Sequence, residues 1–196
     1  FALIMFCGLI VFNVFAECVT RAPGLILANA NYVKKVVFPL EILPVTVLAS
    51  ALVHAAVSLL VLLLGLGFFL GILQWTIIFV PVIFLPLALF CLGFGWFLAS
   101  LGVYIRDIGQ VVGVLIPALM FLSPIFYPLS AVPELFRPLY HVNPLTFIVE
   151  NMQAVVIWGQ LPDWQSMGIG TAVALGTALI GYAWFERTRG GFADVL

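Results

Sequence analysis

His54 is the one readily ionisable side chain within the long apolar runs of this sequence. An ionisable residue in such a run is a functional candidate by default. No carboxylate shares its run, so a hydrogen bond between packed helices is the favoured role, with a functional role as the alternative. A proton-coupled carrier would bury a relay of Asp, Glu or His, and none is visible here. Energy for any transport therefore has to come from outside the chain.

Residues for covalent or metal chemistry are nearly absent. The sequence contains no glycine-rich phosphate loop, no Cys or His pair at metal-ligand spacing and no nucleophile motif. The cysteines Cys7, Cys18 and Cys91 are odd in number and mostly lie in apolar runs, as is typical of small buried side chains. We expect no catalytic residues, no metal site and no cofactor held by this chain.

A mixed polar segment, residues 17–41, is the best candidate for contact with a soluble partner. Pro23 can begin a short helix there, in which apolar residues alternate with Asn31, Tyr32, Lys34 and Lys35. Such a helix is too polar to span a membrane. It either fits a groove on a partner or lies on the membrane surface, with its lysines near anionic head groups.

Composition identifies the surroundings of these residues. Of 196 residues, 65% are apolar and 8% are charged, whereas a soluble domain carries about 25% charged residues. The bilayer is therefore the solvent, and the fold is an all-α polytopic bundle of transmembrane helices. No basic block suggests nucleic acid. Phe1 already lies in an apolar run, so we interpret the chain as an N-terminally truncated single membrane domain.

Charges divide the chain into five expected spans. No charged residue occurs between Glu41 and Arg106, and one helix of that length would be about three bilayer cores long. The chain must turn back once, and residues 71–75, where Gly, Gln and an interfacial Trp meet, are the expected hinge. Pro117 and Pro124 predict a kink in the fourth span. The expected spans are residues 1–16, 42–70, 76–105, 108–127 and 167–185.

Residues 128–164 are rich in proline and too interrupted to span. Asn143 followed by Pro144 is typical of a helix N-cap, and apolar residues then recur at helical spacing, with Glu150 on the other face. Residues 133–141 can form a shorter helix before it. The two helices form either a re-entrant pair, in which a wet cavity or protein covers the backbone, or an ordinary external loop with one surface helix.

The basic residues predict the orientation. With five spans, six basic residues fall on one side and only Arg137 falls on the other, together with Glu134, Glu150 and Asp163. We therefore expect a cytoplasmic C-terminus and an outer position for residues 128–164. The six basic residues are Arg21, Lys34, Lys35, Arg106, Arg187 and Arg189.

Four stretches together resemble a known family. They are Asn31-Tyr-Val-Lys-Lys-Val-Val-Phe-Pro-Leu-Glu-Ile-Leu-Pro44, Tyr104-Ile-Arg-Asp-Ile108, Ser123-Pro-Ile-Phe-Tyr-Pro128 with Asn143-Pro-Leu-Thr146, and Phe192-Ala-Asp-Val-Leu196. In this order they are similar to type-2 ABC exporter permeases that move O-antigen, capsule or teichoic acid chains. The resemblance implies six spans, five of them visible here, in a homodimer with two cytoplasmic ATP-binding subunits that hold ATP and Mg.

The resemblance also implies roles for residues. The segment before the family's third span docks on the ATPase, which assigns coupling to Asn31, Tyr32, Lys34, Lys35 and Glu41. Arg106 and Asp107 either contact the ATPase or simply mark the cytoplasmic turn. The short helices before the last span shape the outer end of the path, which includes Asn143 and Glu150. Aromatic faces suit sugar rings, and the further candidates for the path are Phe94, Trp96, Phe97 and Tyr104.

The expected function is a permease subunit, without a catalytic site of its own, that exports lipid-linked polysaccharide across the cytoplasmic (inner) membrane. One alternative is a type-2 ABC permease for drugs or lipids, which has the same fold and a different cargo. A membrane-embedded lipid-linked sugar transferase is the other alternative, but it would need interfacial acidic clusters or metal ligands that this sequence lacks.

Overall fold

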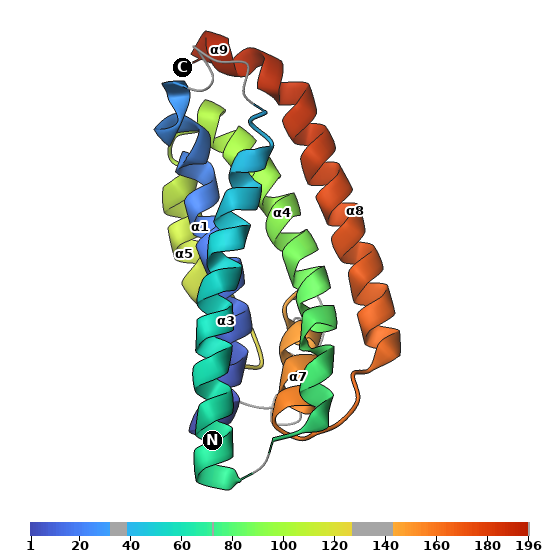
Figure 1. The fold of residues 1–196 in the computed structure, drawn as a ribbon. Coiled ribbons are helices and arrows are strands. Elements are labelled where there is room, and N and C mark those ends of the chain that lie inside the picture. The colour runs from blue at the N-terminus through green and yellow to red at the C-terminus, as the bar shows by residue number, and fades with distance from the viewer. Residues whose placement is uncertain (32–38, 72, 127–142, 196) are drawn as a thin grey trace.

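The computed structural model is an elongated bundle of helices (Figure 1). It describes residues 1–31, 39–71, 73–126 and 143–195. The long helices are α1 (Ala2–Ala28), α3 (Ile42–Leu70), α4 (Val80–Tyr104) and α8 (Trp164–Thr188). The shorter elements are η1 (Trp75–Phe79), α5 (Ile108–Phe121), α7 (Thr146–Val156), η4 (Arg189–Gly191) and α9 (Phe192–Val195).

Within the described residues, four helical segments are long and apolar enough to cross a bilayer. They are Ala2–Ala28, Ile42–Phe68, Trp75–Tyr104 and Trp164–Gly191. The apolar helix α5 has 14 residues, or about 21 Å of rise, which is less than a hydrocarbon core. The described part of the chain is thus an all-helical membrane bundle, and the count of five spans stays a prediction.

Among the long helices, α1, α4 and α8 run in one direction and α3 runs in the other (Figure 1). We call the end that holds the start of α8 and helix α7 the lower end, and the end that holds the C-terminus the upper end. The turn between α3 and α4 lies at the lower end, as the sequence predicts for residues 71–75. Gly71 there adopts φ 63°, ψ 15°, the left-handed conformation that favours glycine at a helix C-terminus.

Helix α4 is the centre of the bundle, with α1 and α8 packed against it. Gly93 and Gly181 let α4 and α8 cross closely, since a Cβ atom at Gly93 would lie 2.7 Å from the carbonyl oxygen of Thr177. This is the close packing that small residues allow between membrane helices. A Cβ atom at Gly181 would likewise meet the backbone of Gly93.

Helix α1 differs from the sequence prediction. Pro23 lies inside it, and the helix continues to Ala28, so the expectation of a new helix that begins at Pro23 is wrong. Proline removes one hydrogen bond and is tolerated in membrane helices whose neighbours cover the backbone. Pro23 is buried. As a consequence Glu17 and Arg21 belong to the long helix and do not lie in a segment beyond its end.

Candidate functional site

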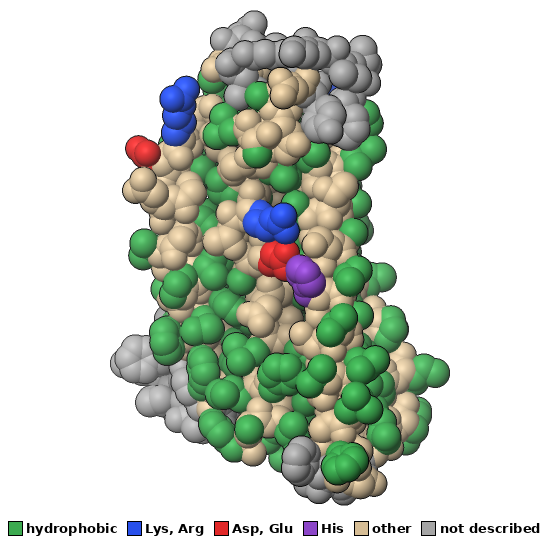
Figure 2. All heavy atoms as spheres, turned by 60° about the vertical axis from the view of Figure 1, so that its left-hand side comes forward, with side chains coloured by type: hydrophobic (Ala, Val, Ile, Leu, Met, Phe, Trp, Pro, Cys, Tyr) green, Lys and Arg blue, Asp and Glu red, His purple; other side chains and the backbone are tan. Residues whose placement is uncertain are grey.

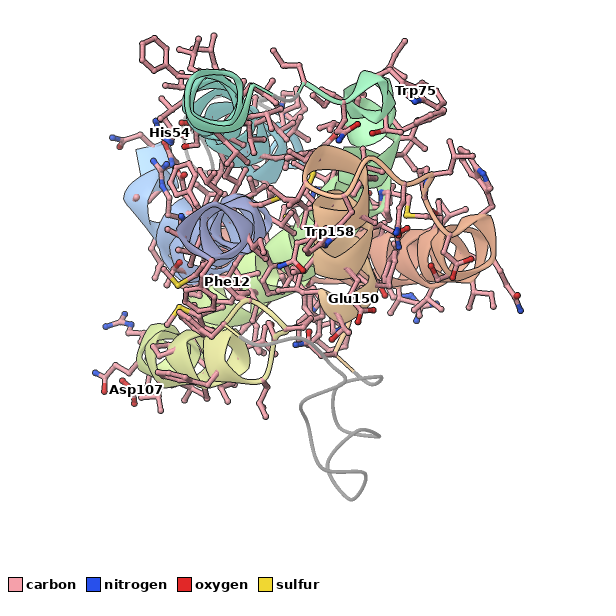
Figure 3. All side chains as sticks on the ribbon, turned by 90° about the horizontal axis from the view of Figure 1, so that it is seen from below. Phe12, His54, Trp75, Asp107, Glu150 and Trp158 are labelled. Atoms are coloured by element: carbon pink, nitrogen blue, oxygen red, sulfur yellow. The ribbon has the colours of Figure 1, made fainter. Side chains whose placement is uncertain are left out.

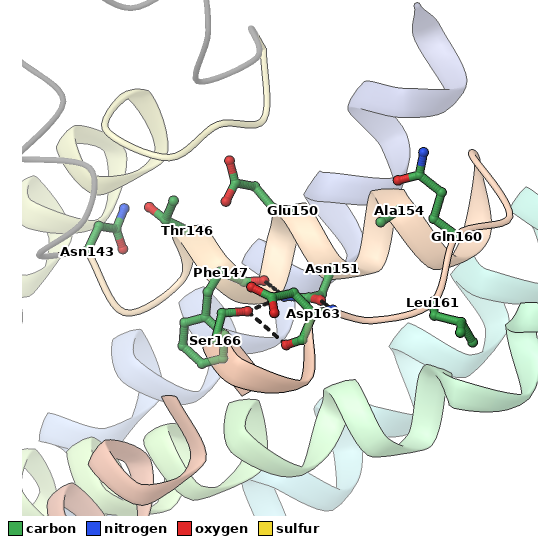
Figure 4. A pocket seen from close by; sticks show the side chains of 10 residues that line it. All are labelled: Asn143, Thr146, Phe147, Glu150, Asn151, Ala154, Gln160, Leu161, Asp163 and Ser166. Atoms are coloured by element: carbon green, nitrogen blue, oxygen red, sulfur yellow. Dashed lines mark hydrogen bonds between the residues drawn. The ribbon is translucent and has the colours of Figure 1, made fainter. Parts of the chain in front are cut away.

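A polar pocket of about 390 Å³ lies at the lower end between α7 and the start of α8 (Figure 4). Its lining combines side-chain amides, hydroxyls and two carboxylates with one aromatic ring. The lining residues are Asn143, Thr146, Phe147, Glu150, Asn151, Ala154, Gln160, Leu161, Asp163 and Ser166.

Asn143 fixes the beginning of α7. Its Oδ1 accepts a hydrogen bond from the backbone N–H of Leu145 at 2.9 Å, which forms a side-chain turn just before the helix. Its Nδ2 donates to the Leu122 carbonyl at 3.0 Å and to Ser123 Oγ at 2.8 Å. The prediction that Asn143 is the N-cap and Pro144 the first helical residue is wrong, because α7 begins at Thr146 and its N-cap is Leu145; Asn143 instead holds the turn that leads into the helix.

Helix α7 is amphipathic, as the spacing predicts. Ile148, Val149 and Met152 are fully buried, whereas Glu150 is exposed and lines the pocket. The helix runs alongside the lower part of α4 (Figure 1). It is joined to η1, which leads into α4, through Thr76, whose Oγ1 donates to the Val155 carbonyl at 2.6 Å. Residues 133–141, the predicted partner helix, lie outside the described residues.

Asn151 connects α7 to the first turn of α8. Nothing in the neighbouring sequence predicts this connection. It is 5% exposed. Its Nδ2 donates to the Phe147 carbonyl at 2.7 Å and to Ser166 Oγ at 3.2 Å, and its Oδ1 accepts from the Asp163 N–H at 2.7 Å. Asp163 in turn caps α8 by accepting from the Gln165 N–H. The pocket floor is therefore held by a satisfied hydrogen-bond network.

The pocket offers hydrogen-bond donors and acceptors beside the ring of Phe147. Sugars present hydroxyl groups along their edges and C–H groups on their faces, so this combination can bind a sugar unit. Across the described residues, no group of three or more His, Cys, Asp or Glu side chains could hold a metal ion.

At the upper end, several predicted site residues contact α8 and η4. Trp96 Nε1 donates to the Glu41 carbonyl at 2.9 Å, and Glu41 Oε2 lies 3.3 Å from Arg189 Nη1. Tyr104 donates to the Thr188 carbonyl at 2.8 Å. Glu41, Trp96 and Tyr104 thus help to hold the ends of α3, α4 and α8 together.

The other predicted coupling residues are separated from these contacts. Arg106 and Asp107 are exposed in the turn between α4 and α5, and Asn31 is exposed just beyond the end of α1. Tyr32, Lys34 and Lys35 lie outside the described residues. The end of α1, the start of α3 and the turn between α4 and α5 all lie at the upper end (Figure 1), so Asn31, Arg106 and Asp107 lie at the same end of the bundle.

The four aromatic candidates do not share one surface. Phe94 and Phe97 line an apolar cavity of about 380 Å³ between α1, α4 and α5, and the ring of Phe94 packs edge-on against Phe15 at 5.6 Å. Trp96 packs against Tyr182 at 5.1 Å, and Tyr104 against Phe192 at 6.1 Å. Only Phe94 and Phe97 meet at one cavity.

Sequence reasoning missed one cluster. His54 Nδ1 lies 3.1 Å from Glu17 Oε2, and Arg21 Nη1 lies 2.9 Å from Glu17 Oε1. His54 therefore has a carboxylate partner, on another helix, and the role of a hydrogen bond between helices is confirmed. The i, i+4 spacing of Glu17 and Arg21 could have indicated an ion pair on one helix. It was overlooked because the first span was expected to end at residue 16, before both residues.

Comparison with known proteins gives matches over most of the chain. The family model described as ABC-2 type transporter matches residues 2–157. The chain is 30% identical to the O-antigen export system permease protein RfbA of Myxococcus xanthus, over 99% of this chain and 75% of that protein. It is 25% identical to RfbA of Klebsiella pneumoniae, over 100% and 76%. It is 27% identical to the polysialic acid transport protein KpsM of Escherichia coli, over 93% and 70%.

Proposed function

The chain belongs to the ABC-2 type transporter family, and on that premise we propose that it is the permease subunit of an exporter for lipid-linked polysaccharide. The main support for this proposal is that relatives from three organisms, matched over nearly the whole chain, are named for O-antigen export or polysialic acid transport. The cargo crosses the cytoplasmic (inner) membrane outward.

We propose that a separate subunit supplies the energy. A homodimer of the permease binds two ATP-binding subunits at its upper end, and these hold ATP and Mg. Docking involves Asn31, Tyr32, Lys34 and Lys35, together with the turn at Arg106 and Asp107. The position of Arg106, Asp107 and Asn31 at one end of the bundle supports this assignment. In this arrangement the upper end and the C-terminus are cytoplasmic.

The polar pocket forms part of the outer exit. Helix α7 has 11 residues and is too short to span, yet it runs beside α4 with its apolar face buried. This position supports a re-entrant segment more than an external loop. A carboxylate such as Glu150 stays ionised at membrane depth only where water reaches it, so we place a wet exit beside α7.

The exit assignment is tested by the Glu150→Leu and Glu150→Gln substitutions. Both remove the charge, and Gln keeps the shape and hydrogen bonding. Export is expected to fall several-fold with Leu and less with Gln, while the amount of protein in the membrane stays constant. Export that is unchanged with Leu would leave α7 as a surface helix of an ordinary loop.

The function itself is tested by deletion of the gene and complementation with the full-length protein. We expect deletion to remove surface polysaccharide and to leave lipid-linked polymer on the cytoplasmic side of the membrane, measured with a glycan-specific label before and after permeabilisation. Normal surface polysaccharide, with altered efflux of drugs or lipids, would favour the alternative cargo. Polymer that is not synthesised at all would favour a sugar transferase.

A further inference from the structure

The unpacked face of the upper half of α1 carries polar and small side chains. Asn13, Glu17, Thr20, Arg21 and Gly24 recur at spacings of three and four, which puts them on one side of the helix. Asn13, Thr20, Arg21 and Gly24 are exposed, and Glu17 is partly exposed. We call these five residues the α1 polar face.

The α1 polar face is joined to α3 by the Glu17 carboxylate, which contacts Arg21 and His54 at once. The side chain of His54 is 68% exposed, that of Arg21 55% and that of Glu17 24%. Figure 2 shows a basic, an acidic and a histidine side chain adjoining at mid-height of this face, and Figure 3 places His54 at the margin of the bundle beside α1. Arg21 and His54 thus both pair with Glu17, and all three side chains are at least partly exposed at the surface of the bundle.

Lipid is a poor neighbour for this face. Charged side chains cost several kcal/mol at the bilayer centre and normally face protein or water. Glu17 lies 11 residues from the end of α1 at Ala28, about 16 Å along the helix, and Arg21 reaches back to Glu17 and not toward the helix end. Outward surfaces of α3 and α8 at similar heights are apolar, with Val53, Val57 and Val173 all more than half exposed. Those surfaces suit lipid, and the α1 polar face does not.

A second copy of the chain is also a poor match. The cores of protein interfaces are depleted in charged residues and rich in large anchors. Between Asn13 and Gly24, the exposed positions of α1 carry no large apolar side chain. The opposite row on α3 continues the polar pattern, because Ser50 and Ser58 flank His54 at spacings of four. This pattern is typical of a surface that exchanges hydrogen bonds with water.

We infer that the α1 polar face, with His54, lines the water-filled path along which the hydrated sugar polymer moves. The inference rests on the proposed export function and names where the path runs. Hydroxyl groups of successive sugar units exchange hydrogen bonds with Asn13, Thr20 and the Glu17–Arg21–His54 cluster. Because water competes for each bond, none of them holds the polymer tightly, as continuous movement requires.

The test uses a cysteine at Thr20 on the α1 polar face and a control cysteine at Val53, which is 62% exposed on the apolar surface of α3. Both lie within about one helical turn of the Glu17–His54 contact, so they are matched in depth. The native cysteines Cys7, Cys18 and Cys91 are buried, so the unsubstituted chain is the blank. The full-length protein and its ATPase subunit, in membranes, are treated with a charged, membrane-impermeant methanethiosulfonate.

Thr20→Cys is expected to react at least tenfold faster than Val53→Cys, and its modification is expected to block polysaccharide export. Asn13→Cys is the second variant and should react likewise. Equal and slow reaction of the three cysteine variants would overturn the inference. A disulfide between the Thr20→Cys residues of two chains, which protects them from the reagent, would also overturn it, because the face would then be a contact between copies. Failure of the proposed function can be told apart from failure of this inference, because the unmodified protein would then export no polysaccharide at all.

Discussion

Asn151 is the residue on which the lower pocket depends most directly. Its side chain bonds to the Phe147 carbonyl in α7 and to Ser166 Oγ and the Asp163 N–H at the start of α8. Removal of its amide leaves the Asp163 N–H and the Ser166 hydroxyl without that partner, and such losses cost about 1–3 kcal/mol when the groups are buried.

We predict that Asn151→Ala lowers the unfolding free energy of the purified permease by about 1–3 kcal/mol and reduces export. Thermal unfolding in detergent measures the first effect. Ser166→Ala is the control: it removes one long Asn151 bond and the bond of Ser166 Oγ to the Asp163 carbonyl, but it leaves the two 2.7 Å bonds of Asn151 to the Phe147 carbonyl and the Asp163 N–H, and it should cost less. Equal costs for the two variants would show that the network does not act through Asn151.

Residue-scale predictions from sequence succeeded where the signal was local. The adjacent Asn143 and Pro144 correctly indicated a turn before α7, because both act on the next turn of chain, although α7 begins at Thr146 with Leu145 as its N-cap. The partners of Asn151 and His54 lie 12 and 37 residues away. Pairings of this kind depend on how helices cross, and spacing within one helix does not reveal them.

The helices themselves were largely readable from the sequence. Uninterrupted apolar length predicted α3 and α4, and the Gly71 hinge is where the chain turns. The extent of α1 was not predicted, because a proline and two charges usually end a span, whereas packing against α4 covers Pro23. Propensity rules describe an isolated helix, and in a bundle neighbouring helices override them.

The crossing of α4 and α8 gives an element-scale prediction. Gly93→Leu is expected to separate the two helices and to destabilise the protein by about 1–3 kcal/mol or more, because its Cβ would meet the Thr177 carbonyl. Gly176→Leu on α8 is the control, since no atom lies within 4 Å of its Cβ position. The yield and thermal stability of the two variants measure the difference, and equal behaviour would refute the close crossing.

At the scale of the whole molecule, the exposed tryptophans support a membrane position. Trp75, Trp158 and Trp164 are all more than half exposed and come from the turns and helix ends at the lower end. On α8 the next exposed aromatic belt is at Tyr182 and Trp184. Twenty residues from Trp164 to Trp184 rise about 30 Å, the thickness of the hydrocarbon core.

We propose that coupling to the ATPase takes place at the upper end. We predict that Lys34→Glu with Lys35→Glu lowers export at least tenfold and removes stimulation of ATP hydrolysis, while the protein stays in the membrane, because the reversed charges would repel the partner surface. Arg187→Glu, an exposed change at the same end on α8, is the control and should have a smaller effect. Unchanged transport and ATPase activity in the lysine variant would indicate a plain surface segment.

The orientation of the bundle follows from where its charges lie. Arg106, Arg187 and Arg189 belong to the upper end, whereas Glu150 and Asp163 belong to the lower end. By the positive-inside rule, we therefore predict that the upper end is cytoplasmic. We predict that Asp107→Cys reacts with an impermeant maleimide only in inverted vesicles, and that Leu161→Cys reacts only in spheroplasts. Reaction of both from one side would contradict a bundle that crosses the membrane end to end, and the reverse pattern would place the C-terminus outside. Neither result depends on the cargo, so this experiment tests the topology separately from the function built on it.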